Sequence, residues 1–130
     1  MATLREDQFN WHPAAGLWSI AQCIDHLNVT ARMYLPMLDE GIADAIRRGL
    51  YAPGPFRYNL LNRMIARSME PPYRIRTRAP KMFQPPPDRP RRDVMAAFRA
   101  YQVQYVDRLR QANGLDLLRA KVASPVVKWL

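Results

Sequence analysis

The sequence contains few of the residues that mark disulfide-linked or metal-cluster proteins: it has one cysteine, Cys23, and two histidines, His12 and His26. A single cysteine excludes an internal disulfide and a cysteine-based zinc cluster, so we expect Cys23 to act as a small hydrophobe on the packed side of a helix. Neither a run of about 18 apolar residues nor a signal-like apolar stretch near Met1 is present. These absences predict a cytoplasmic protein with no membrane partner.

Acidic residues are also scarce, since 20 Lys and Arg oppose 11 Asp and Glu and leave a net charge of +9. The excess is concentrated in residues 51–92, which contain ten basic and two acidic side chains. A basic segment with interleaved aromatic residues can follow a phosphate backbone and stack on bases. A solvated connection kept soluble by its arginines explains the same pattern. We favour the second interpretation, so nucleic-acid binding through residues 57–92 is the weaker alternative.

The length of 130 residues and the apolar content of 48% fit one folded domain, residues 1–130. From Ile20 onward, apolar residues recur at helical spacing, which predicts a long helix over about residues 20–48. Ser19 and Gln22 have the spacing of a capping box at its start, with Trp18 before them able to pack on Cys23. Pro36 lies inside this helix and is expected to bend it rather than end it.

Residues 56–69 carry an apolar stripe typical of a short helix, whereas seven of the twelve prolines lie within residues 71–90 and exclude one there. A second long helix is predicted over about residues 91–112, before Asn113-Gly114. Ser124-Pro125 is a possible further helix start. The long Pro/Arg-rich connection allows the two long helices to run parallel, as crossover connections do in some helical bundles. The expected fold is therefore all-α, with an apolar stripe on each long helix left for something else to cover.

Several short segments resemble one known family. They are Gln8-Phe9-Asn10-Trp11 with Pro13, Trp18-Ser19-Ile20-Ala21-Gln22, Asp25-His26-Leu27, Ala79-Pro80-Lys81-Met82-Phe83 with Pro85, Ala97-Phe98, and Gly114-Leu115-Asp116-Leu117 followed by Ser124-Pro125. In this order they are similar to the DinB-like superfamily, also called the DinB/YfiT-like metalloenzyme fold. The resemblance covers about residues 7–130 and is most specific between Trp18 and Leu27.

The resemblance implies a four-helix bundle whose second and third helices run parallel. It also implies a divalent metal such as Zn or Ni, held by one histidine of the second helix and a His-x-x-x-His pair of the fourth. His26 occupies the second-helix position. The sequence has no His-x-x-x-His pair, and the first and fourth helices of the family are expected to be missing. The fold expected here is thus an incomplete bundle with an incomplete three-histidine site.

Three functions remain open from the sequence. The first is a DinB-like, divalent-metal-dependent enzyme of thiol transferase or hydrolase type, with unknown catalytic residues and unknown small-molecule substrate, inactive as the chain stands. The second is a non-enzymatic assembly element, in which a homodimer or another helical partner completes the bundle. Nucleic-acid binding is the third. For His26, a metal ligand competes with a histidine that is simply hydrogen-bonded in the bundle.

Other candidate residues are assigned structural roles. His12 precedes Pro13 in a loop without ligand geometry. Asp25 points about 100° away from His26 on a helix, and Asp39 lies about 20 Å along the axis, so neither completes the site. Tyr34, Tyr101 and Tyr105 are expected to be aromatic residues at the edge of the core, and not catalytic acids.

Overall fold

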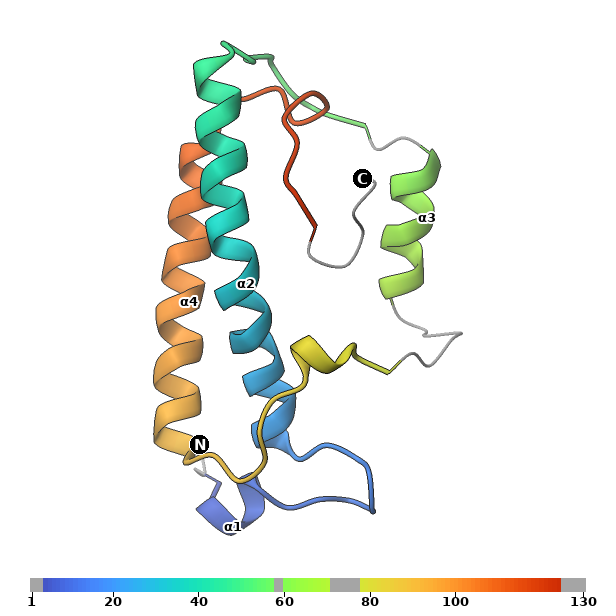
Figure 1. The fold of residues 1–130 in the computed structure, drawn as a ribbon, viewed down its shortest axis with the longest axis vertical. Helices are drawn as coiled ribbons and strands as arrows, with labels where there is room; N and C mark the ends of the chain where they lie inside the picture. Colours follow the sequence, from blue (N-terminus) through green and yellow to red (C-terminus); the bar gives the residue numbers. More distant parts are fainter. Residues whose placement is uncertain (1–3, 58–59, 71–77, 125–130) are drawn as a thin grey trace.

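The computed structural model describes residues 4–57, 60–70 and 78–124 (Figure 1). Its helical elements are α1 (Glu6–Phe9), α2 (Ile20–Arg47), α3 (Leu60–Met69), the 3-10 turn η1 (Lys81–Phe83) and α4 (Arg91–Gln111). Within these ranges no β-strand forms, and the only β pairing is an isolated bridge between Tyr51 and Leu115. The predicted all-α fold with two long helices is confirmed.

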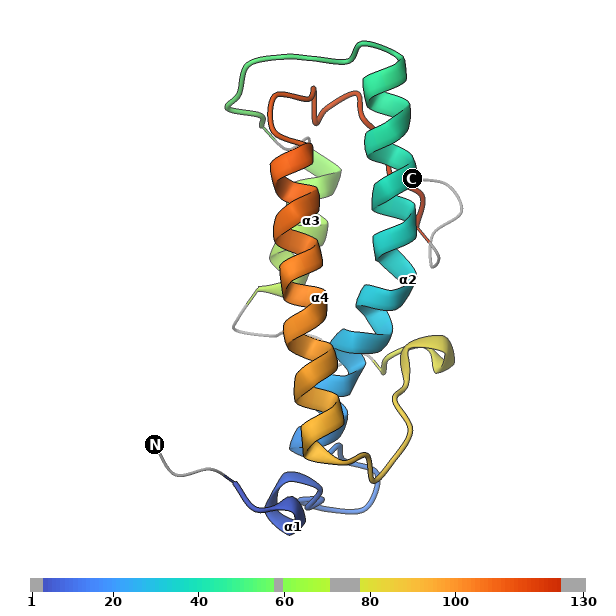
Figure 2. The same ribbon diagram turned by 90° about the vertical axis from the view of Figure 1, so that its left-hand side faces the viewer.

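The start of α2 follows the predicted capping box. Ser19 Oγ accepts from the Gln22 backbone N–H at 3.2 Å, and the Gln22 side chain accepts from the Ser19 N–H at 3.1 Å. These bonds satisfy backbone donors that a helix start leaves unpaired. The helix then continues through Pro36 for 28 residues, or about 42 Å at the usual rise. Figure 2 shows that α2 is not straight but bends in its N-terminal half, and the helix continues beyond the bend as predicted.

The two long helices lie side by side and run in the same direction (Figures 1 and 2). Near their N-termini, Asn28 Nδ2 donates to the Val94 carbonyl at 3.0 Å. Further along, Arg108 Nε and Nη2 each donate to one oxygen of Asp39 at 2.9 Å, which raises the pKa of the Arg108 guanidinium. The matched order of these contacts establishes the parallel arrangement that the long connection allows.

The buried side chains between the helices form two clusters, one near each end. Phe9, Ala21 and Val94 form the lower cluster, and the upper one consists of Ile42, Ala45, Leu50 and Leu115. At the upper end, the chain segments that leave the two helices pair with each other, since Asp116 N donates to Leu50 O at 2.9 Å and Ala52 N to Gly114 O at 3.2 Å. The apolar contacts and the backbone bonds together hold the C-terminal ends of α2 and α4 in register.

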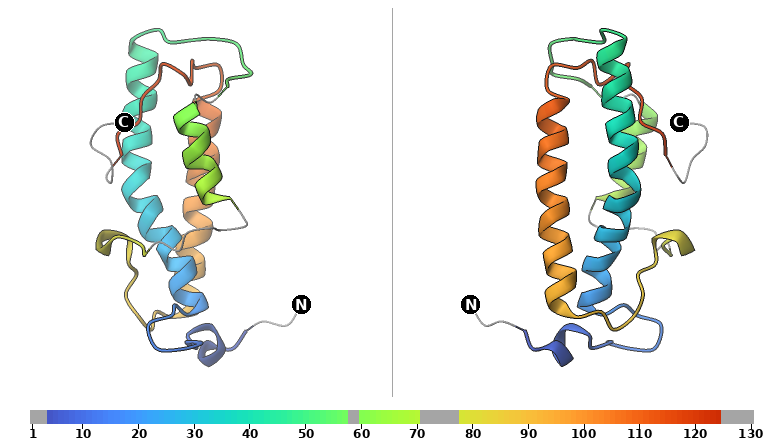
Figure 3. Two further views of the ribbon diagram at one scale, coloured as in Figure 1. Left: turned by 90° about the vertical axis from the view of Figure 1, so that its right-hand side faces the viewer. Right: turned by 60° about the vertical axis from the view of Figure 1, so that its left-hand side comes forward.

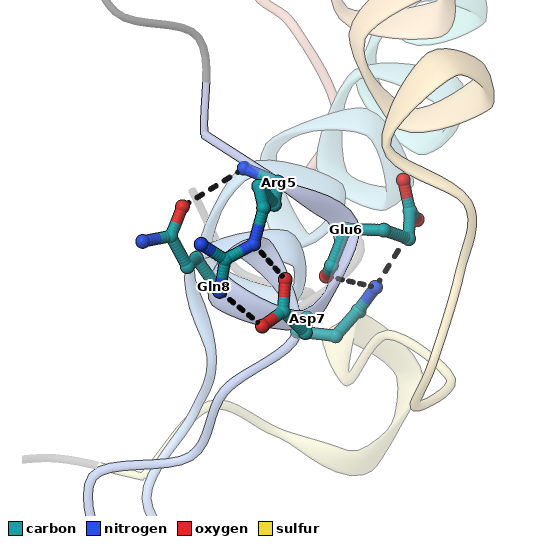
Figure 4. A network of polar contacts seen from close by, with 5 residues as sticks. Arg5, Glu6, Asp7 and Gln8 are labelled. Atoms are coloured by element: carbon teal, nitrogen blue, oxygen red, sulfur yellow. Dashed lines mark hydrogen bonds and ion pairs between the residues drawn. The ribbon is translucent and has the colours of Figure 1, made fainter.

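The one-turn helix α1, whose own polar contacts are drawn in Figure 4, lies below both long helices in Figures 1 and 2. The Glu6 side chain accepts from the Arg91 backbone N–H at 2.7 Å. The N-cap residue of α4 is Pro90, whose side chain makes no capping hydrogen bond. At the start of α1, the N-cap residue Arg5 forms two hydrogen bonds with Asp7, at 3.0 and 2.7 Å, and thereby lowers the pKa of this carboxyl. Glu6, 85 positions before Arg91 in the sequence, thus accepts from a backbone donor at the start of α4 that has no partner within the helix.

In the connections, one helix boundary differs from the sequence prediction, and the chain after α4 takes a path that the sequence did not predict. The short helix α3 begins at Leu60 and not near residue 56, and Phe56 instead lines a groove at the upper end of the helix pair. Figure 1 shows α3 standing apart from α2 and α4, and the right-hand view of Figure 3 shows the two long helices running side by side. The chain after α4 returns along α2, where the Lys121 carbonyl lies so close to Gly41 that a Cβ there would approach it to 2.8 Å. The possible helix start at Pro125 lies outside the described residues.

In the described part of the chain, no helix is both long enough and apolar enough to cross a membrane.

Candidate functional site

The imidazole of His26 lies half-buried on α2, in a pocket of aromatic rings. Its Nδ1 lies 2.8 Å from the Phe83 carbonyl oxygen. A carbonyl can only accept, so Nδ1 carries the proton and Nε2 of the neutral ring keeps its lone pair. The Trp18 ring centroid is 5.2 Å away, and Phe83 meets the imidazole edge-on at 6.4 Å. The ring therefore has a defined tautomer and a restricted orientation.

The proline-rich connection supplies this orientation through η1. Phe83 closes the turn with a bond from its N–H to the Pro80 carbonyl at 2.9 Å, and its side chain is only 5% exposed. The ring stacks on Tyr34 at 6.3 Å with an interplanar angle of 16°. Because the Phe83 side chain is packed against α2, its carbonyl is held over His26. The sequence analysis did not predict this role for Phe83; its one signal was an aromatic residue between prolines in the segment 79–85.

Both aspartates considered for the site are directed elsewhere. The Asp25 side chain is 2% exposed and faces α4, where Arg89 Nη1 lies 3.5 Å from each of its oxygens and Asn28 Nδ2 donates to it at 3.1 Å. Asp39 is held by Arg108. The carboxylates therefore stabilise the helix pair and leave His26 without an acidic neighbour from α2. Neither partner, Arg89 or Arg108, was identified from the sequence.

The expected role of Cys23 is wrong: its side chain is exposed rather than packed. On α2 the side toward α4 is formed by Ala21, Asp25 and Asn28, and the helical period places Cys23 on the other side. The ring of Trp18, which was expected to pack on Cys23, contacts His26.

His12 is an exposed loop residue, as expected, and its Nδ1 lies 2.8 Å from the Leu17 carbonyl.

The tyrosines lie at the edge of the core. Tyr34 stacks on Phe83, and Tyr101 and Tyr105 are half-buried on α4. Burial raises the pKa of the Tyr105 phenol, with a smaller contribution from Tyr34 in the same direction. A phenol held neutral in this way contributes packing, and its hydroxyl is a poor proton donor at neutral pH.

A metal-dependent catalytic site requires about three protein ligands and one open position. Among residues 4–57, 60–70 and 78–124, no group of three or more His, Cys, Asp or Glu side chains could hold a metal ion. The described residues therefore do not fit the complete three-histidine site that the resemblance implies. What they provide is one oriented imidazole nitrogen, and no chemical step can be derived through a metal from this part of the chain.

A groove with a largely apolar lining lies at the opposite end of the helix pair. This groove of about 600 Å³ is lined by α2, α4 and the segments after them, with Gly41, Phe56 and Leu109 on its walls. Gly41 is fifteen residues from His26, or about 22 Å along α2. The groove is therefore separate from the imidazole.

Among the described residues of the basic segment 57–92, two arginines lie near carboxylates. Arg89 is engaged with Asp25, and Arg92 lies 3.7 Å from Asp93. The side chains of Arg57, Arg63, Arg67, Arg78 and Lys81 are exposed. Arg74 and Arg76 lie outside the described residues.

Comparison with known proteins identifies one family. A family model described as the DinB superfamily matches residues 1–129. No curated protein and no solved structure matches the chain.

Proposed function

This chain belongs to the DinB superfamily, and we propose that it takes part in divalent-metal-dependent chemistry of thiol transferase or hydrolase type on a small molecule. In this proposal the described residues supply one metal ligand, Nε2 of His26. The supporting observation is the 2.8 Å contact between His26 Nδ1 and the Phe83 carbonyl. A single chain with only this ligand is expected to show no turnover.

The contact has the form that metal-binding histidines commonly use. Such a histidine donates its second ring N–H to a carbonyl or carboxylate, and this bond sets the tautomer and aims the other nitrogen at the metal. In this chain the donor is Nδ1, so the ligand atom is Nε2. Trp18 and Phe83 limit rotation of the ring from two directions. When bound by three ligands, a divalent ion lowers the pKa of a coordinated water or thiol.

The proposal predicts that His26 is the main binding site for Ni²⁺ or Zn²⁺ in the purified chain. One imidazole makes a weak site, so isothermal titration should show one weakly bound ion per chain, and His26→Gln should remove it. His12→Gln is the matched control, because His12 has the same Nδ1-to-carbonyl contact in an exposed loop. Equal binding by the wild type and His26→Gln would contradict the proposal.

Nitrogen NMR of the two imidazoles tests the structural premise without metal. The spectrum of the wild type should show His26 as the Nδ1–H tautomer at pH above the imidazole pKa. Added Zn²⁺ should shift the Nε2 resonance of His26. If His26 is the Nε2–H tautomer instead, the assignment of Nε2 as the ligand atom is wrong.

A specific observation also favours the second candidate, an assembly element. On α4, Val103, Val106 and Leu109 are 62%, 44% and 71% exposed. At about 100° per residue the three span roughly 120° of the helix surface, with Val103 opposite the buried Val94 and Leu109 at the edge of the α2–α4 groove. We propose that two copies cover this apolar side in a homodimer and so extend the helix pair to a bundle.

Val106→Glu is expected to convert the dimer to a monomer, because it places two charges in the apolar contact. Sedimentation equilibrium measures the change. Gln111→Glu is the control, since it adds the same charge at an exposed position of α4 that lies about 140° around the helix from Val106. A wild-type chain that remains monomeric at high micromolar concentration would exclude this assembly.

A further inference from the structure

The exposed side of α3 combines apolar and basic side chains. Leu60 and Met64 are 74% and 62% exposed, and Arg63 and Arg67 are exposed beside them. These four positions follow the i, i+3, i+4, i+7 spacing, so at about 100° per residue they lie within roughly 100° of the helix surface. The solvent-facing side of a helix is ordinarily polar. Here it carries two large uncovered apolar side chains beside two arginines.

The positive charge of α3 is not neutralised within the helix. At the end of α2, Arg47 pairs with Asp44 at 2.9 Å. By contrast, α3 contains no acidic residue, and Glu70 lies just beyond its end. Arg63 and Arg67 take part in none of the ion pairs formed among the described residues. Both guanidinium groups are therefore available to an anionic partner.

We propose that α3 binds the surface of an anionic phospholipid membrane. In this arrangement Leu60 and Met64 enter the boundary between headgroups and acyl chains, and the two arginines reach lipid phosphates. Arginine suits this position because its aliphatic stem can lie along apolar surface while its guanidinium stays among polar groups. The expectation of no membrane partner rested on the absence of spanning and signal segments, and a helix that lies on a membrane surface requires neither.

The exposed stripe of α3 fits a lipid surface better than it fits the other partners of a basic helix. A helix bound in a protein groove uses apolar anchors at i, i+3, i+4 and i+7, and two of these four positions are Arg63 and Arg67 here. Single-stranded nucleic acid is bound by aromatic side chains that stack on bases, and α3 contains none. Because α3 stands apart from the long helices in Figure 1, its exposed side can reach a flat surface.

Sedimentation with lipid vesicles tests the inference on the full-length chain. Vesicles of phosphatidylserine and phosphatidylcholine should bind the chain roughly tenfold or more tightly than phosphatidylcholine alone, and added salt should weaken the binding. The double variant Arg63→Gln with Arg67→Gln should lower the binding by roughly tenfold or more. Arg47→Gln with Arg110→Gln is the matched control, because it removes the same two charges from exposed positions of α2 and α4. It should lower the binding by less than about twofold.

Met64→Gln separates insertion of α3 from attraction by charge alone. This variant keeps every charge and should lower vesicle binding by roughly fivefold, because less apolar surface leaves water. Leu118→Gln is its control, since Leu118 is 64% exposed and lies after α4. It should leave the binding unchanged. Circular dichroism verifies that each variant remains helical.

Three results would overturn the inference. The first is equal binding to vesicles with and without phosphatidylserine. The second is an equal loss of binding in the α3 variants and their controls, because the net charge of +9 would then explain the attraction. The third is tighter binding to a single-stranded RNA oligonucleotide that the double arginine variant abolishes, which would assign α3 to nucleic acid. None of these measurements involves His26 or a metal, so the proposed function is tested separately.

Discussion

Leu115→Ala is expected to destabilise the protein by about 2–4 kcal/mol, the usual range for removing a buried leucine side chain. Leu115 is 2% exposed and packs with Ile42, Ala45 and Leu50 where the two long helices end. The alanine would leave a cavity at the point where the segments after α2 and α4 are hydrogen-bonded. Urea unfolding followed by circular dichroism measures the change in the free energy of unfolding.

Leu118→Ala is the matched control for this variant. Leu118 lies three residues later and is 64% exposed, so its truncation should change the free energy of unfolding by less than about 0.5 kcal/mol. Similar losses for the two variants would show that Leu115 is not a core residue. The upper cluster would then not be the contact that joins the C-terminal ends of α2 and α4.

Arg89→Ala is expected to cost about 2–3 kcal/mol of unfolding free energy. The change leaves the buried Asp25 carboxylate with Asn28 as its one remaining side-chain donor among the described contacts. Removing one partner of a fully buried pair costs about 3–5 kcal/mol. A smaller value applies here because the Arg89 side chain is 41% exposed and its contacts are 3.5 Å long. Thermal and urea unfolding measure the difference.

Arg92→Ala provides the comparison, since Arg92 is 94% exposed and 3.7 Å from Asp93. Its loss should change stability by less than about 0.5 kcal/mol. A double variant, Asp25→Asn with Arg89→Ala, should be more stable than Arg89→Ala alone, because the buried group is then uncharged. If the double variant loses as much as both single changes together, the pair is not coupled.

The predictable part of the fold came from local signals. The Ser19 and Gln22 capping box and the apolar spacing after Ile20 located the start and length of α2 to within a residue. Local rules also identified α4, because the proline-rich stretch ends at Pro90 and Gly114 follows the last apolar turn. The length of the connection then allowed the parallel order. Each of these signals acts over a few residues, so it can be read without the tertiary structure.

The candidate site was predictable only in part. His26 was singled out by its place in the Trp18 to Leu27 segment, whereas its orientation depends on Phe83, 57 residues away. The exposure of Cys23 was predicted wrongly, because an apolar pattern alone does not say which side of α2 faces α4. The partners Arg89 and Arg108 were missed for the same reason.

Local sequence signals determined the all-α class, the two long helices and the family to which the chain belongs. These depend on helical periodicity, capping and short motifs, which are properties of neighbouring residues. The buried environment of Asp25 and the tautomer of His26 depended on the packing of distant segments. A hydrogen bond or an ion pair between residues 57 or 64 positions apart exists only once the chain has brought them together.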